Sequence, residues 1–177
     1  MTREVLVGVC GGVAAFKAAA LVSQLVQTGY GVQVILTESA SHFVGSAPFS
    51  ALSGRPVAER LFDPRFPLGA HIELAQQADL LLIVPVTANI LAKTALGIAD
   101  DLLSTTYLAF KGPVLMAPAM NGEMWSQPAV QRNVRQLEED GVTMIGPASG
   151  WLSCRQEGSG RMAEPTEILD AVGTHLP

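Results

Sequence analysis

The chain has 177 residues, a formal net charge of −5, 49% hydrophobic residues and 15% charged residues. This length predicts one domain over residues 1–177, and the composition excludes a disordered chain, which would be richer in charge. The negative charge argues against nucleic-acid binding. No apolar run reaches the ~18 residues that span a bilayer, and no signal peptide is recognisable. We therefore expect a cytoplasmic protein without membrane or nucleic-acid partners.

Five short apolar runs predict buried parallel strands. They cover residues 5–9, 32–36, 80–84, 114–116 and 142–145. Helical spacing of apolar residues follows the first run up to Gly29, and helical stretches are predicted at 87–96, 100–110 and 129–140. Strands that alternate with helices predict an α/β fold, a single-domain, Rossmann-like, doubly wound parallel sheet with helices on both faces.

Two segments lack a clear pattern. Residues 47–69 are rich in proline and glycine, and residues 149–160 contain glycines without any periodicity. We interpret the second segment as a mobile loop or flap. The low share of charged residues also suggests that other subunits cover part of the surface.

In a doubly wound sheet, ligands bind beyond the carboxyl ends of the strands. Gly11 and Gly12 follow the first strand and would let the backbone approach a phosphate or a ring. The dinucleotide pattern G-x-G-x-x-G is incomplete there, which disfavours an NAD(P) oxidoreductase. After the second strand, Glu38 could bind a ribose, or Thr37 and Ser39 could hold a phosphomonoester. Capping of a helix by Ser39 is the purely structural alternative.

Other polar residues also have two interpretations. Thr87 follows the third strand and is a good helix N-cap, and His71 lies in a helical pattern in which histidines are often structural. The acidic pair Asp100 and Asp101 is better explained by helix capping. No His, Cys, Asp or Glu residues show metal-ligand spacing, so we predict no metal site.

The two cysteines differ in their surroundings. Cys10 ends a buried strand and is interpreted as a small apolar core residue. Cys154 lies in a polar, glycine-rich segment beside Arg155, and a nearby positive charge favours proton exchange by a thiol. Cys154 is therefore the better candidate for chemistry.

Several motifs together resemble one family, the homo-oligomeric flavin-containing cysteine decarboxylases. The resemblance covers the chain from Gly8 to about Ile168. The motifs are residues 11–17 (GGVAAFK), 71–74 (HIEL), 85–89 (PVTAN), 97–103 (GIADDLL), 118–125 (PAMNGEMW), and Cys154 with 158–162 (GSGRM). Each motif is weak by itself, but their order and separation make the resemblance specific.

The resemblance implies a non-covalently bound FMN. The residues implied to bind it are Gly11, Gly12, Val13, Thr37, Ser39, Thr87, Ala88, Asn89 and Ala119. It also implies a homotrimer, or a dodecamer built from trimers, with active sites at subunit contacts.

Within the family, the motifs are most similar to those of enzymes that decarboxylate 4′-phosphopantothenoylcysteine in coenzyme A biosynthesis. The implied reaction oxidises the substrate to a thioaldehyde, releases CO₂ to leave an enethiolate, and reduces this again. His71, Asn121 and Cys154 are the implied catalytic residues. Asn121 would grip the substrate carboxylate and Cys154 would donate a proton, with Met120 and Arg161 as further substrate-binding residues, in a flap at about 149–162.

The sequence departs from the family pattern in three ways. Arg155 stands where a glycine usually follows the flap cysteine, and Thr87 replaces a serine but keeps the hydroxyl. Many bacterial relatives carry a fused synthetase domain after the decarboxylase, whereas this sequence stops at Pro177, which fits either a stand-alone enzyme or an excised domain. The alternatives are a peptidyl-cysteine decarboxylase of the lantibiotic type, which often lacks the flap cysteine, and a non-catalytic flavin-binding regulatory subunit, which usually has a long acidic tail. A flavin prenyltransferase lacks this set of His71, Asn121 and Cys154.

Overall fold

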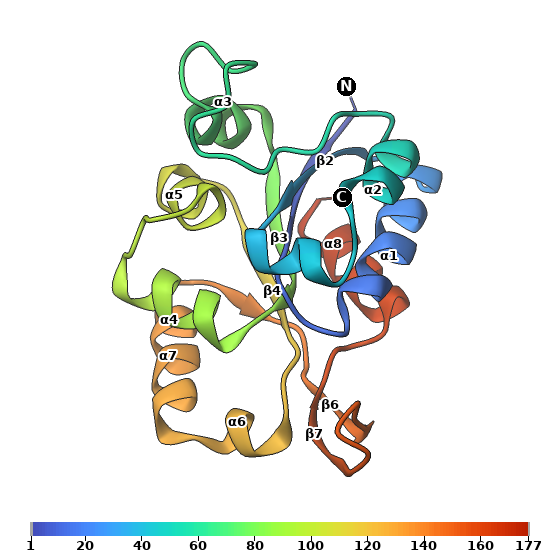
Figure 1. The fold of residues 1–177 in the computed structure, drawn as a ribbon, viewed down its shortest axis with the longest axis vertical. Coiled ribbons are helices and arrows are strands. Elements are labelled where there is room, and N and C mark those ends of the chain that lie inside the picture. The colour runs from blue at the N-terminus through green and yellow to red at the C-terminus, as the bar shows by residue number, and fades with distance from the viewer. Residues whose placement is uncertain (1, 177) are drawn as a thin grey trace.

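A computed structural model describes residues 2–176 and contains one five-stranded sheet (Figure 1). The strands are β1 (Glu4–Val9), β2 (Gly31–Leu36), β3 (Leu80–Val86), β4 (Val114–Pro118) and β5 (Thr143–Met144). Their order across the sheet is β2-β1-β3-β4-β5, and all neighbouring strands are parallel. The predicted parallel α/β fold is confirmed, and all five apolar runs form strands of this sheet.

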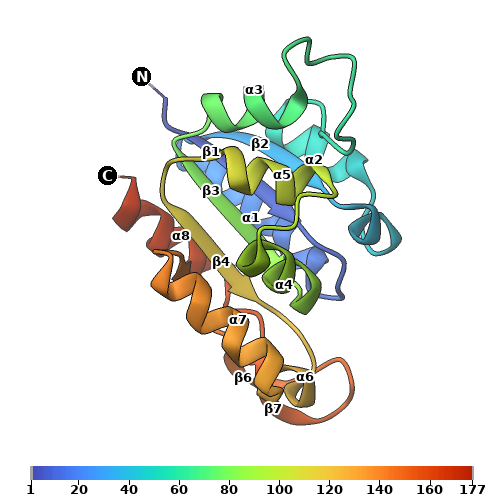
Figure 2. The same cartoon turned by 90° about the vertical axis from the view of Figure 1, so that its left-hand side faces the viewer.

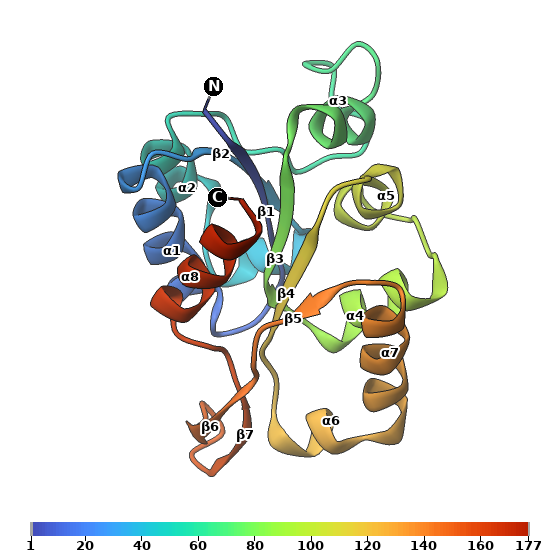
Figure 3. The ribbon, with the colours of Figure 1, turned by 180° about the vertical axis from the view of Figure 1, so that it is seen from behind.

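Helices cover both faces of the sheet (Figures 1 and 3). One face carries α1 (Ala15–Gln27), α2 (Ser46–Ser53) and α8 (Pro165–His175). The other carries α3 (Ala70–Gln77), α4 (Ala88–Leu96), α5 (Leu102–Ala109) and α7 (Pro128–Glu139). A short 3-10 helix, η1 (Glu38–His42), follows β2, and α6 (Gly122–Ser126) follows β4.

Side chains that alternate along the central strands fill two separate cores. Val5 and Val7 of β1 pack on the α1 and α8 side, whereas Leu6 packs on the α3, α4, α5 and α7 side. Every residue of β3 is buried. This is why the strands are continuous apolar runs, since both faces of a helix-covered parallel sheet are closed to water.

Helices α2, α6 and α8 were not predicted, and α3 was anticipated only by the helical pattern around His71. Helix α2 falls in the proline- and glycine-rich segment, where Phe49 is completely buried and fixes the helix on the sheet. Helix α8 begins with Pro165, and Glu164 and Glu167 form a capping box around its first turn. Both are standard signals for a helix start. The predicted helices form as α1, α4, α5 and α7, with ends that differ by one or two residues.

The segment interpreted as a mobile loop or flap has regular secondary structure. It forms an antiparallel hairpin of β6 (Ala148–Trp151) and β7 (Glu157–Arg161), which projects from one end of the molecule (Figure 2). Its strands were missed because they show no apolar alternation, and Gly150, Gly158 and Gly160 occupy inner positions. No helix among residues 2–176 is long and apolar enough to cross a membrane.

Candidate functional site

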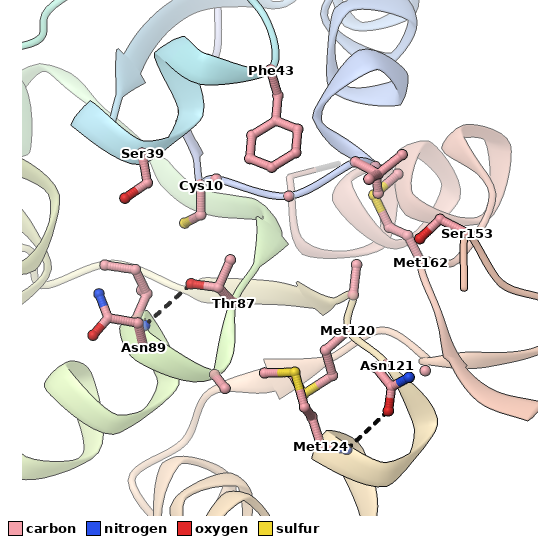
Figure 4. A pocket seen from close by; sticks show the side chains of 18 of the residues that line it. Cys10, Ser39, Phe43, Thr87, Asn89, Met120, Asn121, Met124, Ser153 and Met162 are labelled. Atoms are coloured by element: carbon pink, nitrogen blue, oxygen red, sulfur yellow. Dashed lines mark hydrogen bonds between the residues drawn. The ribbon is translucent and has the colours of Figure 1, made fainter.

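A cavity of about 910 Å³ lies at the carboxyl ends of the central strands (Figure 4). The strand order reverses between β1 and β3, which is where an open parallel sheet leaves a crevice for ligands. Every residue that the sequence predicts for cofactor or substrate binding lines this cavity. They are Gly11, Gly12, Val13, Thr37, Ser39, Thr87, Ala88, Asn89, Ala119, Met120, Asn121 and Arg161.

The glycine pair after β1 forms one wall. A Cβ atom on Gly11 would lie 2.7 Å from the carbonyl carbon of Ser39, so no larger residue fits between β1 and η1. A Cβ on Gly12 would meet nothing within 4 Å. Helix α1 then begins without any side-chain cap, and the N–H groups of Ala15 and Lys17 donate to the carbonyls of Gly12 and Ala14 at 2.9 and 3.0 Å. The partial positive charge of this helix N-terminus favours an anionic group beside it.

Replacing Gly11 by alanine is expected to weaken flavin binding and to destabilise the fold. The added methyl group must displace Ser39, and such overpacking typically costs ~1–3 kcal/mol. Flavin absorbance per protein and the thermal midpoint would measure the two effects. Gly45→Ala is the matched control, since a Cβ there meets nothing within 4 Å and its φ is −71°. Equal flavin content in both variants would contradict the prediction.

The cavity wall after β2 contains η1, and Ser39 is not the residue that caps this helix. Capping of η1 comes from Thr37, whose hydroxyl oxygen accepts a hydrogen bond from the backbone N–H of Ala40 at 3.3 Å, and not from Ser39. Ser39 lies within η1 on the cavity side, and the ring of Phe43 projects into the cavity (Figure 4). Ser39 is therefore the hydroxyl that remains available to an anionic group.

The two helices that follow β3 begin at N-cap residues predicted from the sequence. Thr87 accepts a hydrogen bond from the N–H of Ile90 at 3.4 Å and caps α4, and its side chain also lines the cavity. Asp101 caps α5 in a capping box with Ser104. Lys93 forms ion pairs with Asp100 at 2.6 Å and Asp101 at 2.7 Å, and Lys93 and Asp101 line the cavity.

The two thiols have very different environments. Cys10 lies in the cavity wall but is almost completely buried, and this burial raises the pKa of its thiol to about 12. Its placement agrees with the prediction of a small buried residue. Cys154 is exposed and lines the cavity from the hairpin side.

We expect only one thiol to react quickly with a disulfide reagent near pH 8. Thiolate is the reactive form, and Cys10 remains almost fully protonated far above neutral pH, whereas Cys154 is accessible. Counting released chromophore over time gives the stoichiometry in the native protein. The Cys154→Ser variant should lose the fast phase, and a fast phase that survives this substitution would contradict the assignment.

Asn121 is fixed by the start of α6. Its side-chain oxygen accepts hydrogen bonds from the backbone N–H groups of Glu123 at 2.8 Å and Met124 at 3.4 Å. This N-cap uses the amide oxygen and leaves the NH₂ group to donate to a ligand. An amide donor held in this way is suited to a carboxylate.

The hairpin is attached to the same loop. The N–H of Met120 donates to the carbonyl of Gly160 at 2.9 Å, and Gly160 has φ +121° and leaves no room for a side chain against the Met120 carbonyl. On the other side, Glu164 pairs with both Arg161 and Lys17 of α1. The base of the hairpin is thus joined to two walls of the cavity.

Arg155 has an unusual conformation at the tip of this hairpin. Its φ is 62°, and it is the single non-glycine residue with positive φ among residues 2–176. Glycine adopts this left-handed region freely, whereas other residues do so at a cost. The turn itself forms with arginine in place, because the N–H of Leu152 reaches the carbonyl of Gln156 at 2.9 Å.

His71 is the one predicted site residue that does not line the cavity. It lies at the start of α3, at the opposite end of the molecule from the hairpin (Figures 1 and 3). Its Nδ1 atom is buried and has no hydrogen-bond partner within the described chain. Within residues 2–176, no three His, Cys, Asp or Glu side chains are grouped closely enough to hold a metal ion.

The cavity suits a flat aromatic ring carrying an anionic group. Val13, Phe43 and Ala119 supply apolar surface, the hydroxyl of Ser39 can donate a hydrogen bond, and the N-terminus of α1 supplies a partial positive charge. Sequence reasoning missed several lining residues, among them Phe43, Lys93, Met124 and Trp151. The available signal for Phe43 and Trp151 was an aromatic side chain in a segment without apolar periodicity.

Comparison with known proteins gives a consistent family. The family model described as Flavoprotein matches residues 1–176. The coenzyme A biosynthesis bifunctional protein CoaBC of Bacillus subtilis (strain 168) is 47% identical over 175 residues, covering 98% of this chain and 43% of that protein. CoaBC of Mycobacterium tuberculosis (strain ATCC 25618 / H37Rv) is 48% identical over 166 residues, covering 94% and 40%. The chain therefore spans about two fifths of these curated relatives.

Solved structures have the same fold over nearly their whole length. The FMN-dependent cysteine decarboxylase SpaF superposes with a TM-score of 0.87 at 36% identity, covering 98% of this chain and 95% of that one. A cysteine-to-serine variant of a PPC decarboxylase, complexed with pantothenoylaminoethenethiol, has a TM-score of 0.87 at 32% identity and covers 98% of both chains.

Proposed function

We propose, since this chain belongs to the flavoprotein family, that it catalyses the FMN-dependent decarboxylation of 4′-phosphopantothenoylcysteine to 4′-phosphopantetheine in coenzyme A biosynthesis. The observation that carries the proposal is one cavity lined by both Asn121 and Cys154 together with all the residues predicted to bind FMN. Two relatives support the substrate, the CoaBC proteins named for coenzyme A biosynthesis and the PPC decarboxylase of like fold.

FMN would be held by the segments after the first four strands. Ser39, with Thr37 beside it, is placed for the phosphate, and Gly11, Gly12 and Val13 for close approach of the ring. Thr87, Ala88, Asn89 and Ala119 complete the proposed FMN site. When bound, the flavin would supply reversible two-electron oxidation of the thiol-bearing carbon, which gives the electrons left by CO₂ a place to delocalise.

The remaining work falls to side chains of this protein. The NH₂ group of Asn121 would orient the substrate carboxylate, and a neutral amide does this without strongly stabilising the charge that must disappear. Cys154 would donate the proton that completes the product, and His71 would act as a base or orient the substrate. Met120 and Arg161 are proposed to contact the substrate, with residues 149–162 as the substrate flap of a single domain.

Because His71 lies outside the cavity, the proposal includes a homotrimer, or a dodecamer of trimers, that brings it to the cavity of a neighbouring copy. Exposed apolar side chains away from the cavity support association. They include Phe62, Leu68 and Leu96, which are 90%, 70% and 69% exposed. A cytoplasmic location belongs to the same proposal, as the compartment in which this biosynthetic reaction would take place.

The direct test incubates the FMN-loaded protein with 4′-phosphopantothenoylcysteine and measures product mass and released CO₂. The expected product is 4′-phosphopantetheine. The serine analogue of the substrate is the control, since it has no thiol to oxidise and should not react. A peptide ending in cysteine tests the lantibiotic-type alternative. Turnover of the peptide alone, or no turnover with flavin bound, would overturn the proposal.

A further inference from the structure

Trp151 presents an aromatic surface to the cavity, and residues 2–176 leave most of it uncovered. It is the last residue of β6, lines the cavity, and is 65% exposed. The other tryptophan, Trp125 of α6, packs against the core on the α7 side of the sheet. A large exposed indole forgoes the free energy of burying apolar surface, unless a ligand covers it.

The hairpin holds Trp151 in a defined place. Trp151 pairs with Glu157 across the hairpin, and Gly150 before it has no side chain. The side chain of Arg161 uses that space, since a Cβ on Gly150 would lie 3.1 Å from its Nη1 atom. Arg161 is in turn paired with Glu164, which also binds Lys17 of α1. The strand bearing Trp151 is therefore anchored to the body of the protein.

The reacting end of a substrate would lie at Asn121 and Cys154, which line the same cavity as Trp151. Cys154 lies three residues beyond Trp151 in the turn of the hairpin. The exposed apolar side chains of Val13 and Phe16 line the same cavity. A ligand in this cavity can therefore meet apolar surface from the hairpin and from the start of α1.

We propose that Trp151 contacts the non-reacting arm of the substrate and makes the site selective for N-acylcysteines with a long, branched alkyl and amide arm. This inference rests on the proposed function. It adds a residue that contacts the part of the substrate far from the reacting cysteine. An indole suits such an arm, because its face packs on alkyl groups and its N–H can donate to an amide carbonyl.

The first test is the split between KM and kcat with 4′-phosphopantothenoylcysteine. Trp151→Ala is expected to raise KM about tenfold, with kcat within about twofold of the wild-type value, because it removes binding that the ground state and transition state share. Trp151→Phe should recover most of the affinity, and Trp125→Phe is the matched control. An unchanged KM in Trp151→Ala would overturn the inference. An equal rise in KM in Trp125→Phe with its flavin retained would also overturn it.

The second test measures the fluorescence emission of Trp151. In the FMN-loaded Trp125→Phe variant, Trp151 is the sole indole. Its emission should shift to shorter wavelength with saturating 4′-phosphopantetheine, and not with N-acetylcysteine, which lacks the arm. No response at ligand saturation, established by equilibrium dialysis, would overturn the inference. A shift in a protein that releases no CO₂ from the substrate would support this contact while rejecting the proposed reaction.

Discussion

Replacing Cys154 by serine is expected to stop the reaction after CO₂ loss, so that the oxidised enethiol accumulates in place of 4′-phosphopantetheine. Cys154 is the exposed thiol that lines the cavity, on the turn of the hairpin, and Asn121 lines the same cavity. A serine hydroxyl is a much weaker acid, and loss of a general acid typically slows its step by ~10²–10⁴-fold. CO₂ release and product mass, followed together, separate the two halves of the reaction.

The neighbouring residue offers a control for this variant. Arg155 has φ 62°, which glycine adopts without strain, so Arg155→Gly should preserve the turn and give the normal product. This pair of variants separates the thiol from the shape of the hairpin. Normal reduced product from Cys154→Ser at the wild-type rate would reject the role of the thiol. The enethiol from Arg155→Gly would instead assign the final step to the conformation of the turn.

The sheet was predictable because its strands have only one chemical requirement. Buried parallel strands must be apolar throughout, and all of β3 satisfies this in the sequence as well as in the structure. The ends of the strands then place the glycine pair, Thr37 and Thr87 around one cavity without further information. Position along the chain was therefore enough to predict most of the site.

The hairpin was not predictable in this way, because its structure depends on distant partners. Gly160 needs φ +121° and a close approach to Met120, forty residues earlier, and Arg161 is held by Glu164 and Lys17. None of these contacts leaves a periodic pattern. The same limit applies to Thr37 and Ser39, because either hydroxyl could cap a helix that follows β2, and the structure shows that Thr37 is the N-cap of η1.

His71 shows a different limit, because a sequence motif identifies a residue but does not say whether its side chain reaches the site of its own chain. The histidine begins α3 and is absent from the cavity that contains the other predicted catalytic residues. A residue can serve such a site only from another copy of the protein. Its buried Nδ1 atom, unpartnered within residues 2–176, and the exposed Ile72 beside it are consistent with a surface that meets another copy.

We expect His71→Asn to lose turnover by ~10²–10⁴-fold while it keeps its flavin, because the substitution removes the proposed base and His71 does not line the cavity proposed to hold the flavin. Co-expression with Cys154→Ser should then restore formation of 4′-phosphopantetheine. In mixed oligomers, some sites combine the intact cavity of one chain with the intact histidine of its neighbour. With equal amounts and random assembly, about one quarter of sites should have both.

The control pairs two substitutions within one cavity. Asn121 and Cys154 line the same cavity of one chain, so co-expressed Asn121→Ala and Cys154→Ser chains should never form a site in which both residues are intact. That mixture should make no 4′-phosphopantetheine above the sum of the separate variants. Restoration in this control would show exchange of whole hairpins between chains. If the His71→Asn and Cys154→Ser mixture also stays inactive, His71 does not act across a subunit contact, and its position on α3 makes it a structural residue.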